Sequence, residues 1–110
     1  MIIPATHLKI PQGTTWAHAW RVSGVDFTDA TWHAESQIRH HVDSHDVLHD
    51  FKTSDTITFE GGVVLITLTP ATTSAWTWHR GVYDVEIHSD DGRVYRVAQG
   101  PVTLLPEVTR

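Results

Sequence analysis

The chain has 110 residues, a formal net charge of −5, nine histidines and five tryptophans, and its length predicts a single domain covering residues 1–110. The absence of cysteine excludes disulfides, thiolate metal ligands and cysteine nucleophiles, and the acidic charge balance argues against binding to nucleic acid. No stretch has the length of a membrane span, and the first residues lack the pattern of a signal peptide, so no membrane association is expected.

Alternating polar and apolar residues predict strands through the first half of the chain. After an N-terminal strand, residues 14–22 place Trp16, His18, Trp20 and Val22 on one face of a strand and Ala17, Ala19 and Arg21 on the other. Residues 30–39 alternate in the same way, with small or apolar side chains at the even positions and polar side chains at the odd ones. The even positions are therefore expected to face the core and the odd positions to face water.

The second half of the chain predicts further strands and one hairpin. Residues 61–69 are nearly all apolar and β-branched, which is typical of a central strand covered on both faces. Residues 81–89 alternate again, with Tyr83, Val85 and Ile87 expected to face inward and Asp84, Glu86 and His88 outward. The turn at 89–93 carries Asp-Gly at its tip. Residues 93–99 return from this turn, and residues 101–108 are expected to form a last, separate strand.

One segment, near residues 70–78, has helix signals instead. Thr69 is suited to the N-cap, Pro70 to the first helical position and Gly81 to the residue after the helix end. The pattern predicts a helix of about two turns, with Trp76 or Trp78 closing one open end of a sheet pair. Short strands with frequent turn signals and one connecting helix indicate a mostly β protein, a β-sandwich.

The order of these elements, together with several short motifs, resembles a known family. The motifs occupy residues 13–16, 26–31, 38–39, 63–73, 81–86, 91–94, 100–104 and 108–110. Together they resemble the small immunoglobulin-like domain of tailed bacteriophages, similar to the N-terminal domain of phage baseplate upper proteins. The resemblance implies an immunoglobulin-like antiparallel β-sandwich of seven to eight strands with one short helix, covering almost the whole chain.

The same resemblance implies a function. It points to a non-enzymatic structural protein of the virion, in the tail or baseplate region, assembled in the host cytoplasm and needing no cofactor. Its expected partners are other virion proteins and copies of itself in a cyclic homo-oligomer. Two alternatives stay open: a head-decoration or head–tail joining protein and, from another class, a carbohydrate-binding module for host attachment.

Histidine and aspartate are concentrated in residues 38–51, which hold four histidines and three aspartates. On a helix, His41, His45 and His49 would share one face and could bind Zn²⁺ or Ni²⁺. The segment lies between two strands and contains turn residues, so it is interpreted as an exposed polar hairpin with its turn at 43–46. That hairpin would pair His40 with His49 and leave room for a pH-responsive contact. No metal is expected, and the minor candidate ligands are His40, His41, His45 and His49.

The base of this hairpin and three further motifs have structural interpretations. Ile38, Val47 and Phe51 are expected to anchor the hairpin to the core. Residues 44–46 contain the residue types of a Ser-His-Asp triad, but neighbours on one turn cannot assemble one. Asp84 and Glu86 share one strand face at about 7 Å, within reach of a glycosidase pair, but no cleft is implied. The acidic turn at 89–93 lacks the ligand count of a calcium loop.

The tryptophans offer a different kind of site. Trp32 is expected in the core because it falls at an inward position. Trp16 and Trp20, on one face with His18, either pack into the core, which is the favoured interpretation, or belong to an exposed aromatic strip. Such a strip would bind a neighbouring subunit by burial or a sugar by stacking, and the subunit is favoured because aromatic residues are enriched at interfaces. The candidate interface residues are Trp16, His18, Trp20, Trp78 and Arg80.

Overall fold

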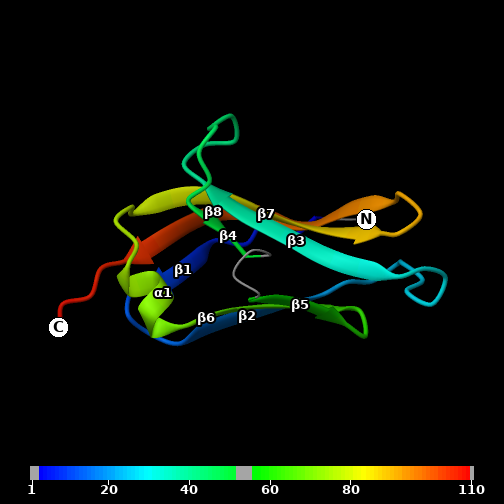
Figure 1. The fold of residues 1–110 in the computed structure, drawn as a ribbon, viewed down its shortest axis with the longest axis horizontal. Helices are drawn as coiled ribbons and strands as arrows, with labels where there is room; N and C mark the ends of the chain where they lie inside the picture. The colour runs from blue at the N-terminus through cyan, green and yellow to red at the C-terminus, as the bar shows by residue number, and fades with distance from the viewer. Residues whose placement is uncertain (1–2, 52–55, 110) are drawn as a thin grey trace.

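Two β-sheets face each other in the structure, a computed structural model that describes residues 3–51 and 56–109 (Figure 1). The strands are β1 (Leu8–Pro11), β2 (Trp16–Arg21), β3 (Trp32–Arg39), β4 (His49–Asp50), β5 (Ile57–Glu60), β6 (Val63–Leu68), β7 (Arg80–Ser89) and β8 (Val94–Leu105), and helix α1 spans Pro70–Ser74. The larger sheet has the order β1-β8-β7-β3-β4 and the smaller sheet the order β2-β6-β5. The predicted mostly β sandwich of eight strands with one short helix is confirmed.

The core lies between the sheets, where the alternating strands present their apolar faces. On β3 and β7 the predicted inward positions are buried, and the odd positions of β3 and the even positions of β7 lie on the outer surface of the larger sheet. The smaller sheet contributes Val64, Ile66 and Leu68 from β6. The period-two pattern therefore assigned the faces of these central strands correctly.

Three details of the sheets differ from the prediction. β6 is the central strand of its sheet, but only one of its faces is covered, and Leu65 on the outer face is 38% exposed. Residues 94–105 form one continuous strand in place of two, with a register shift between Val85 and Glu86 of the neighbouring β7. β1 runs parallel to β8, whereas every other strand pair is antiparallel among the described residues.

Helix α1 closes one end of the sandwich, on the left in Figure 1. The N-cap prediction is confirmed, because the Thr69 hydroxyl accepts the backbone N–H of Thr72. The helix ends at Ser74, earlier than expected, and Gly81 lies within β7, so its assignment as the residue after the helix is wrong. Gly81 is required for another reason: a Cβ there would lie 2.7 Å from the carbonyl oxygen of Arg39 on β3. Within the described ranges, no helix has the length and apolarity to cross a bilayer.

One fully buried hydroxyl ties this helix to the turn between β1 and β2. The Oγ1 of Thr73 accepts the backbone N–H of Gly13 at 2.8 Å, and the side chain of Gln12 donates to the carbonyl of Thr73 at 3.2 Å. Thr73→Val keeps the shape but leaves the Gly13 N–H without this acceptor. We expect a loss of about 1 kcal/mol in unfolding free energy, measured by urea denaturation. Thr77→Val, at an exposed position, serves as the control and should change stability by less than about 0.5 kcal/mol.

Candidate functional site

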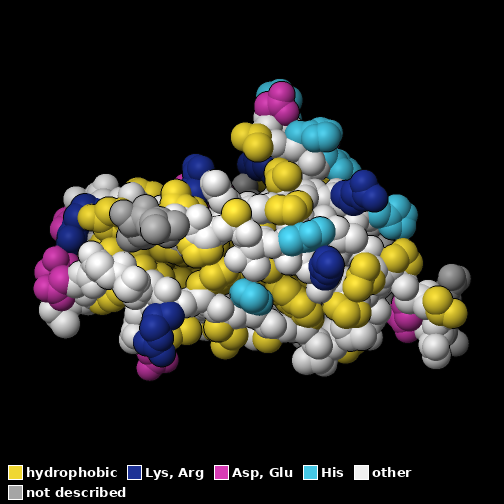
Figure 2. Space-filling model, turned by 180° about the vertical axis from the view of Figure 1, so that it is seen from behind, with side chains coloured by type: hydrophobic (Ala, Val, Ile, Leu, Met, Phe, Trp, Pro, Cys, Tyr) yellow, Lys and Arg dark blue, Asp and Glu magenta, His cyan; other side chains and the backbone are white. Residues whose placement is uncertain are grey.

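The histidine-rich segment forms a protruding loop between β3 and β4, at the top of Figure 1 (Figure 2 shows its histidine and acidic side chains on the surface). The predicted exposed loop is therefore present, but its pairing differs. His49 pairs with Ile38, not with His40, and its ring packs 5.2 Å from that of Trp76. Burial lowers the pKa of His49. The loop is anchored by Ile38 and Phe51 as expected, whereas Val47 is 40% exposed and does not serve as an anchor.

The loop does not assemble the groups that its composition suggested. The Ser44 hydroxyl accepts a hydrogen bond from the backbone N–H of His41 at 3.0 Å, which stabilises the turn. Ser44 therefore has a structural role in the turn and is not the nucleophile of a triad with His45. Within residues 3–51 and 56–109, the one group of three or more possible metal ligands lies elsewhere, at His33, Glu35 and His88. No such group in this part of the chain contains any of the candidate metal ligands of the loop, which were His40, His41, His45 and His49.

The converging side chains come from the two neighbouring central strands β3 and β7. His33 pairs directly with His88, and Glu35 pairs directly with Glu86, so the four residues occupy the corners of a rectangle on the outer surface of the larger sheet. Directly opposed side chains in an antiparallel pair lie about 5 Å apart at Cβ. We refer to His33, Glu35, Glu86 and His88 as the His–Glu cluster.

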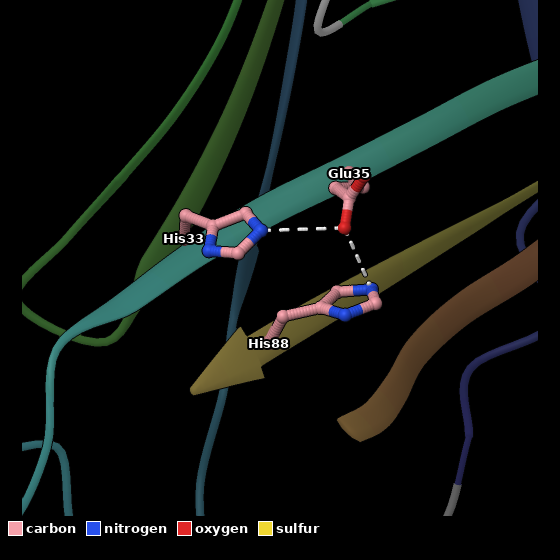
Figure 3. Close-up of side chains that lie close together, drawn as sticks. All are labelled: His33, Glu35 and His88. Carbon is pink, nitrogen blue, oxygen red and sulfur yellow. Dashed lines mark hydrogen bonds and ion pairs between the residues drawn. The ribbon is translucent and has the colours of Figure 1, made fainter. Parts of the chain in front are cut away.

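The ligand atoms of the His–Glu cluster lie close together (Figure 3). Glu35 Oε2 is 3.3 Å from His33 Nε2 and 3.0 Å from His88 Nε2. The two imidazoles stack with their centroids 5.3 Å apart, and Glu86 Oε1 lies 3.2 Å from His88 Nε2. The side chain of His33 is 54% exposed and that of His88 26% exposed, so the cluster is open to solvent on the His33 side.

The alternating pattern places all four residues on the solvent-facing sides of their strands but does not show that they lie together. The available signal was a mirrored pattern, His-x-Glu in β3 and Glu-x-His in β7. Two antiparallel strands that carry such motifs in register set histidine against histidine and glutamate against glutamate. The pairing of β3 with β7 and its register were not predicted, because alternation alone does not specify which residues lie opposite each other.

A groove of about 640 Å³ lies beside the cluster on the same outer surface. Its polar lining includes Gln37, Arg39, Asp84, Glu86, Arg96 and Gln99. The alternation of Asp84 and Glu86 along the strand does not indicate this groove, because the groove depends on neighbouring strands. Both carboxylates face the Arg96 guanidinium, at 3.7 Å for Asp84 and 3.9 Å for Glu86. Burial, and secondly the charge of Glu86, raise the pKa of Asp84, an effect that the nearby arginines oppose.

The aromatic interface candidates face inward. Trp16, His18 and Trp20 share one face of β2, as predicted, but this face points into the sandwich, where Trp20 is 7% exposed. The ring of Trp20 lies 6.0 Å from that of Tyr83 on the opposite sheet. Trp78 is 8% exposed, so neither Trp20 nor Trp78 offers a contact surface. Trp16 and His18 are half-buried, and Arg80 is exposed at the start of β7.

The other face of β2 belongs to an exposed, weakly polar surface. Leu65 of β6 lies at its centre, paired with Ala19 of β2 on one side and Thr58 of β5 on the other. We call this surface the small-sheet face. Its residues are Ala17, Ala19, Arg21, Thr58, Glu60, Val63, Leu65 and Thr67.

No protein-family model matches this sequence, and the search of curated proteins returns no match.

Proposed function

We propose that this chain is a non-enzymatic structural component of a tailed phage particle, in the tail or baseplate region, and that it acts through protein–protein contacts. Its partners are other virion proteins and copies of itself. The motif resemblance supports this proposal, as does a β-sandwich with the expected strands and helix.

The observation that carries the contact role is the small-sheet face. Alanines next to Leu65 make its centre flat, and a flat apolar centre allows a partner surface to approach closely. Charged residues lie at one end, where Arg21 and Glu60 both pair with Val63. An apolar centre bordered by polar residues is typical of a protein interface, and here the charged part of the border lies at one end.

β2 adds a second way to make contacts on the same side of the molecule. It is an edge strand of the smaller sheet and is six residues long. When His18 is neutral, Arg21 is the one charged residue of this strand. Natural edge strands that avoid pairing carry prolines, inward charges or several lysines. β2 has none of these features, so a partner strand can pair with it.

Leu65→Glu is the variant that tests this surface. A charge at the centre of the small-sheet face would have to be buried in the complex without a partner, so we expect self-association to weaken at least about tenfold. Light scattering coupled to size-exclusion chromatography, over a range of protein concentrations, measures the effect. Leu105→Glu is the matched control, since Leu105 is also an exposed leucine, 42% against 38%, but lies on the larger sheet. Equal weakening by both variants, or by neither, would contradict the assignment of this face.

The virion location has its own test. Mass spectrometry of purified particles should detect the chain, and immunogold labelling should place it at the tail or baseplate. Labelling over the capsid would support the head-decoration alternative. The carbohydrate-binding alternative relied on Trp16, Trp20 or Trp78 as stacking platforms, and two of these are buried. Binding on a glycan array would revive it at another surface.

A further inference from the structure

We propose that His33, Glu35 and His88 bind a divalent transition-metal ion, with Zn²⁺ as the reference case, on the outer surface of the β3–β7 strand pair. The inference is independent of the phage proposal, because it depends only on the geometry of the His–Glu cluster.

The distances between the donor atoms fit a tetrahedral ion. With Zn–N and Zn–O bonds of about 2.0–2.1 Å, ligand atoms in a tetrahedral site lie about 3.3 Å apart. The two contacts of Glu35 Oε2, at 3.3 Å to His33 Nε2 and 3.0 Å to His88 Nε2, already have this length. All three donor atoms lie within 4.8 Å of one another, so small rotations of the two imidazoles bring the third edge into range.

The donor types select the class of ion. Two imidazole nitrogens and a carboxylate oxygen suit Zn²⁺, Co²⁺, Ni²⁺ and Cu²⁺, whereas Mg²⁺ and Ca²⁺ prefer sites made of oxygen ligands. The exposure of His33 leaves room for water or a partner's side chain as a fourth ligand. Glu86 Oε1 lies 3.2 Å from the same His88 Nε2, so this carboxylate is placed to become that fourth ligand.

The backbone and the local charges favour such a site. Both strands are internal to the larger sheet, β3 between β7 and β4 and β7 between β8 and β3, so the ligands start from rigid positions. Glu35 and Glu86 are directly opposed across the two strands, and like charges at such positions repel. A dication between the imidazoles and Glu35 would offset that repulsion. The Arg96 guanidinium, 3.9 Å from Glu86, already offsets part of it.

The test is titration of the untagged, chelator-treated protein with zinc chloride in an isothermal calorimeter. We expect one ion per chain for the wild type, with no competition from millimolar Mg²⁺. Loss of a residue that only hydrogen-bonds to a metal ligand weakens metal binding about 10- to 100-fold. His33→Ala and His88→Ala each remove a direct ligand, so each should weaken zinc binding at least about 100-fold. His33 is largely exposed, so His33→Ala should fold normally even if His88→Ala does not.

The control is the double variant His41→Ala/His45→Ala, which removes two histidines from the protruding loop and leaves the cluster intact. It should bind zinc with the same stoichiometry and with an affinity within about twofold of the wild type. Co²⁺ absorption gives a second readout, because a tetrahedral N₂O-type site gives intense visible bands that His33→Ala should abolish. No saturable binding to the wild type would overturn the proposal. Binding that survives His33→Ala but is lost in the loop double variant would also overturn it.

Discussion

Phe51→Ala is expected to lower the unfolding free energy by about 3–5 kcal/mol and the Tm by more than about 10 °C. Phe51 is the largest of the fully buried side chains, with 0% of its surface exposed, and it follows β4 at the base of the protruding loop. Its ring also packs edge-on against His49, with centroids 4.7 Å apart. Truncation to alanine would remove apolar contacts from both sheets' shared core and leave a cavity.

Two further variants make this prediction specific. Phe51→Leu retains much of the buried volume and should lose clearly less stability than Phe51→Ala. Val42→Ala, in the same loop but 90% exposed, should stay within about 0.5 kcal/mol of the wild type. Chemical denaturation followed by tryptophan fluorescence measures all three. A loss below about 1 kcal/mol for Phe51→Ala would mean that the loop is not anchored through this residue.

Tyr83→Phe should reverse its effect on stability between neutral and strongly alkaline pH. The Tyr83 hydroxyl is the donor of a 2.6 Å hydrogen bond to the carbonyl of Thr6, and the side chain is 4% exposed. Burial raises the pKa of Tyr83 from 10.0 to about 12, and the hydrogen bond to Thr6 partly opposes this rise. At pH 7 the variant loses one buried hydrogen bond, so it should be about 1 kcal/mol less stable than the wild type.

At high pH the sign changes because the tyrosine ionises first in the unfolded chain. A folded pKa above the unfolded one contributes stability that is complete below pH 10 and is lost as the pH rises to about 12. The unfolding free energy of the wild type should fall by about 2–3 kcal/mol over this range, whereas that of Tyr83→Phe should not fall for this reason. The two stability curves should therefore cross between pH 10 and 12 in urea titrations. Tyr95→Phe, which keeps Tyr83, should still decline over this window, and parallel curves for wild type and Tyr83→Phe would refute the explanation.

Alternation predicted the faces of β2, β3 and β7, whereas the expected burial of β6 on both faces was wrong. In β3 every second residue is polar or charged, and in β7 every second residue except Val82 is, so only one face of each strand can be buried. In β2 the two faces carry Trp-His-Trp and Ala-Ala-Arg, and neither is polar enough to identify the solvent side. In β6 the outer face is nearly as apolar as the inner one, so the continuous apolar run suggested burial on both sides. The alternative left open for β2 and the error in β6 both concern the small-sheet face, where the exposed surface is only weakly polar.

The candidate site was missed for a different reason. Histidine density drew attention to the loop, where His41 and His45 are close in sequence but lie on a turn that exposes them. His33 and His88 are 55 positions apart in sequence (88 − 33), and they meet only because β3 and β7 pair in one particular register. A metal site on a sheet depends on strand pairing, which local sequence patterns do not encode.

The parallel pairing of β1 with β8 has a mechanical consequence. Four consecutive residue pairs join the two strands, from Leu8 with Val102 to Pro11 with Leu105. The start of β1 and the end of β8 lie toward opposite ends of the molecule, as the N and C labels of Figure 1 indicate. Tension applied through these two ends therefore loads the hydrogen bonds of the pair in shear, all at once, and does not open them one after another. A domain built this way resists stretching along its long axis.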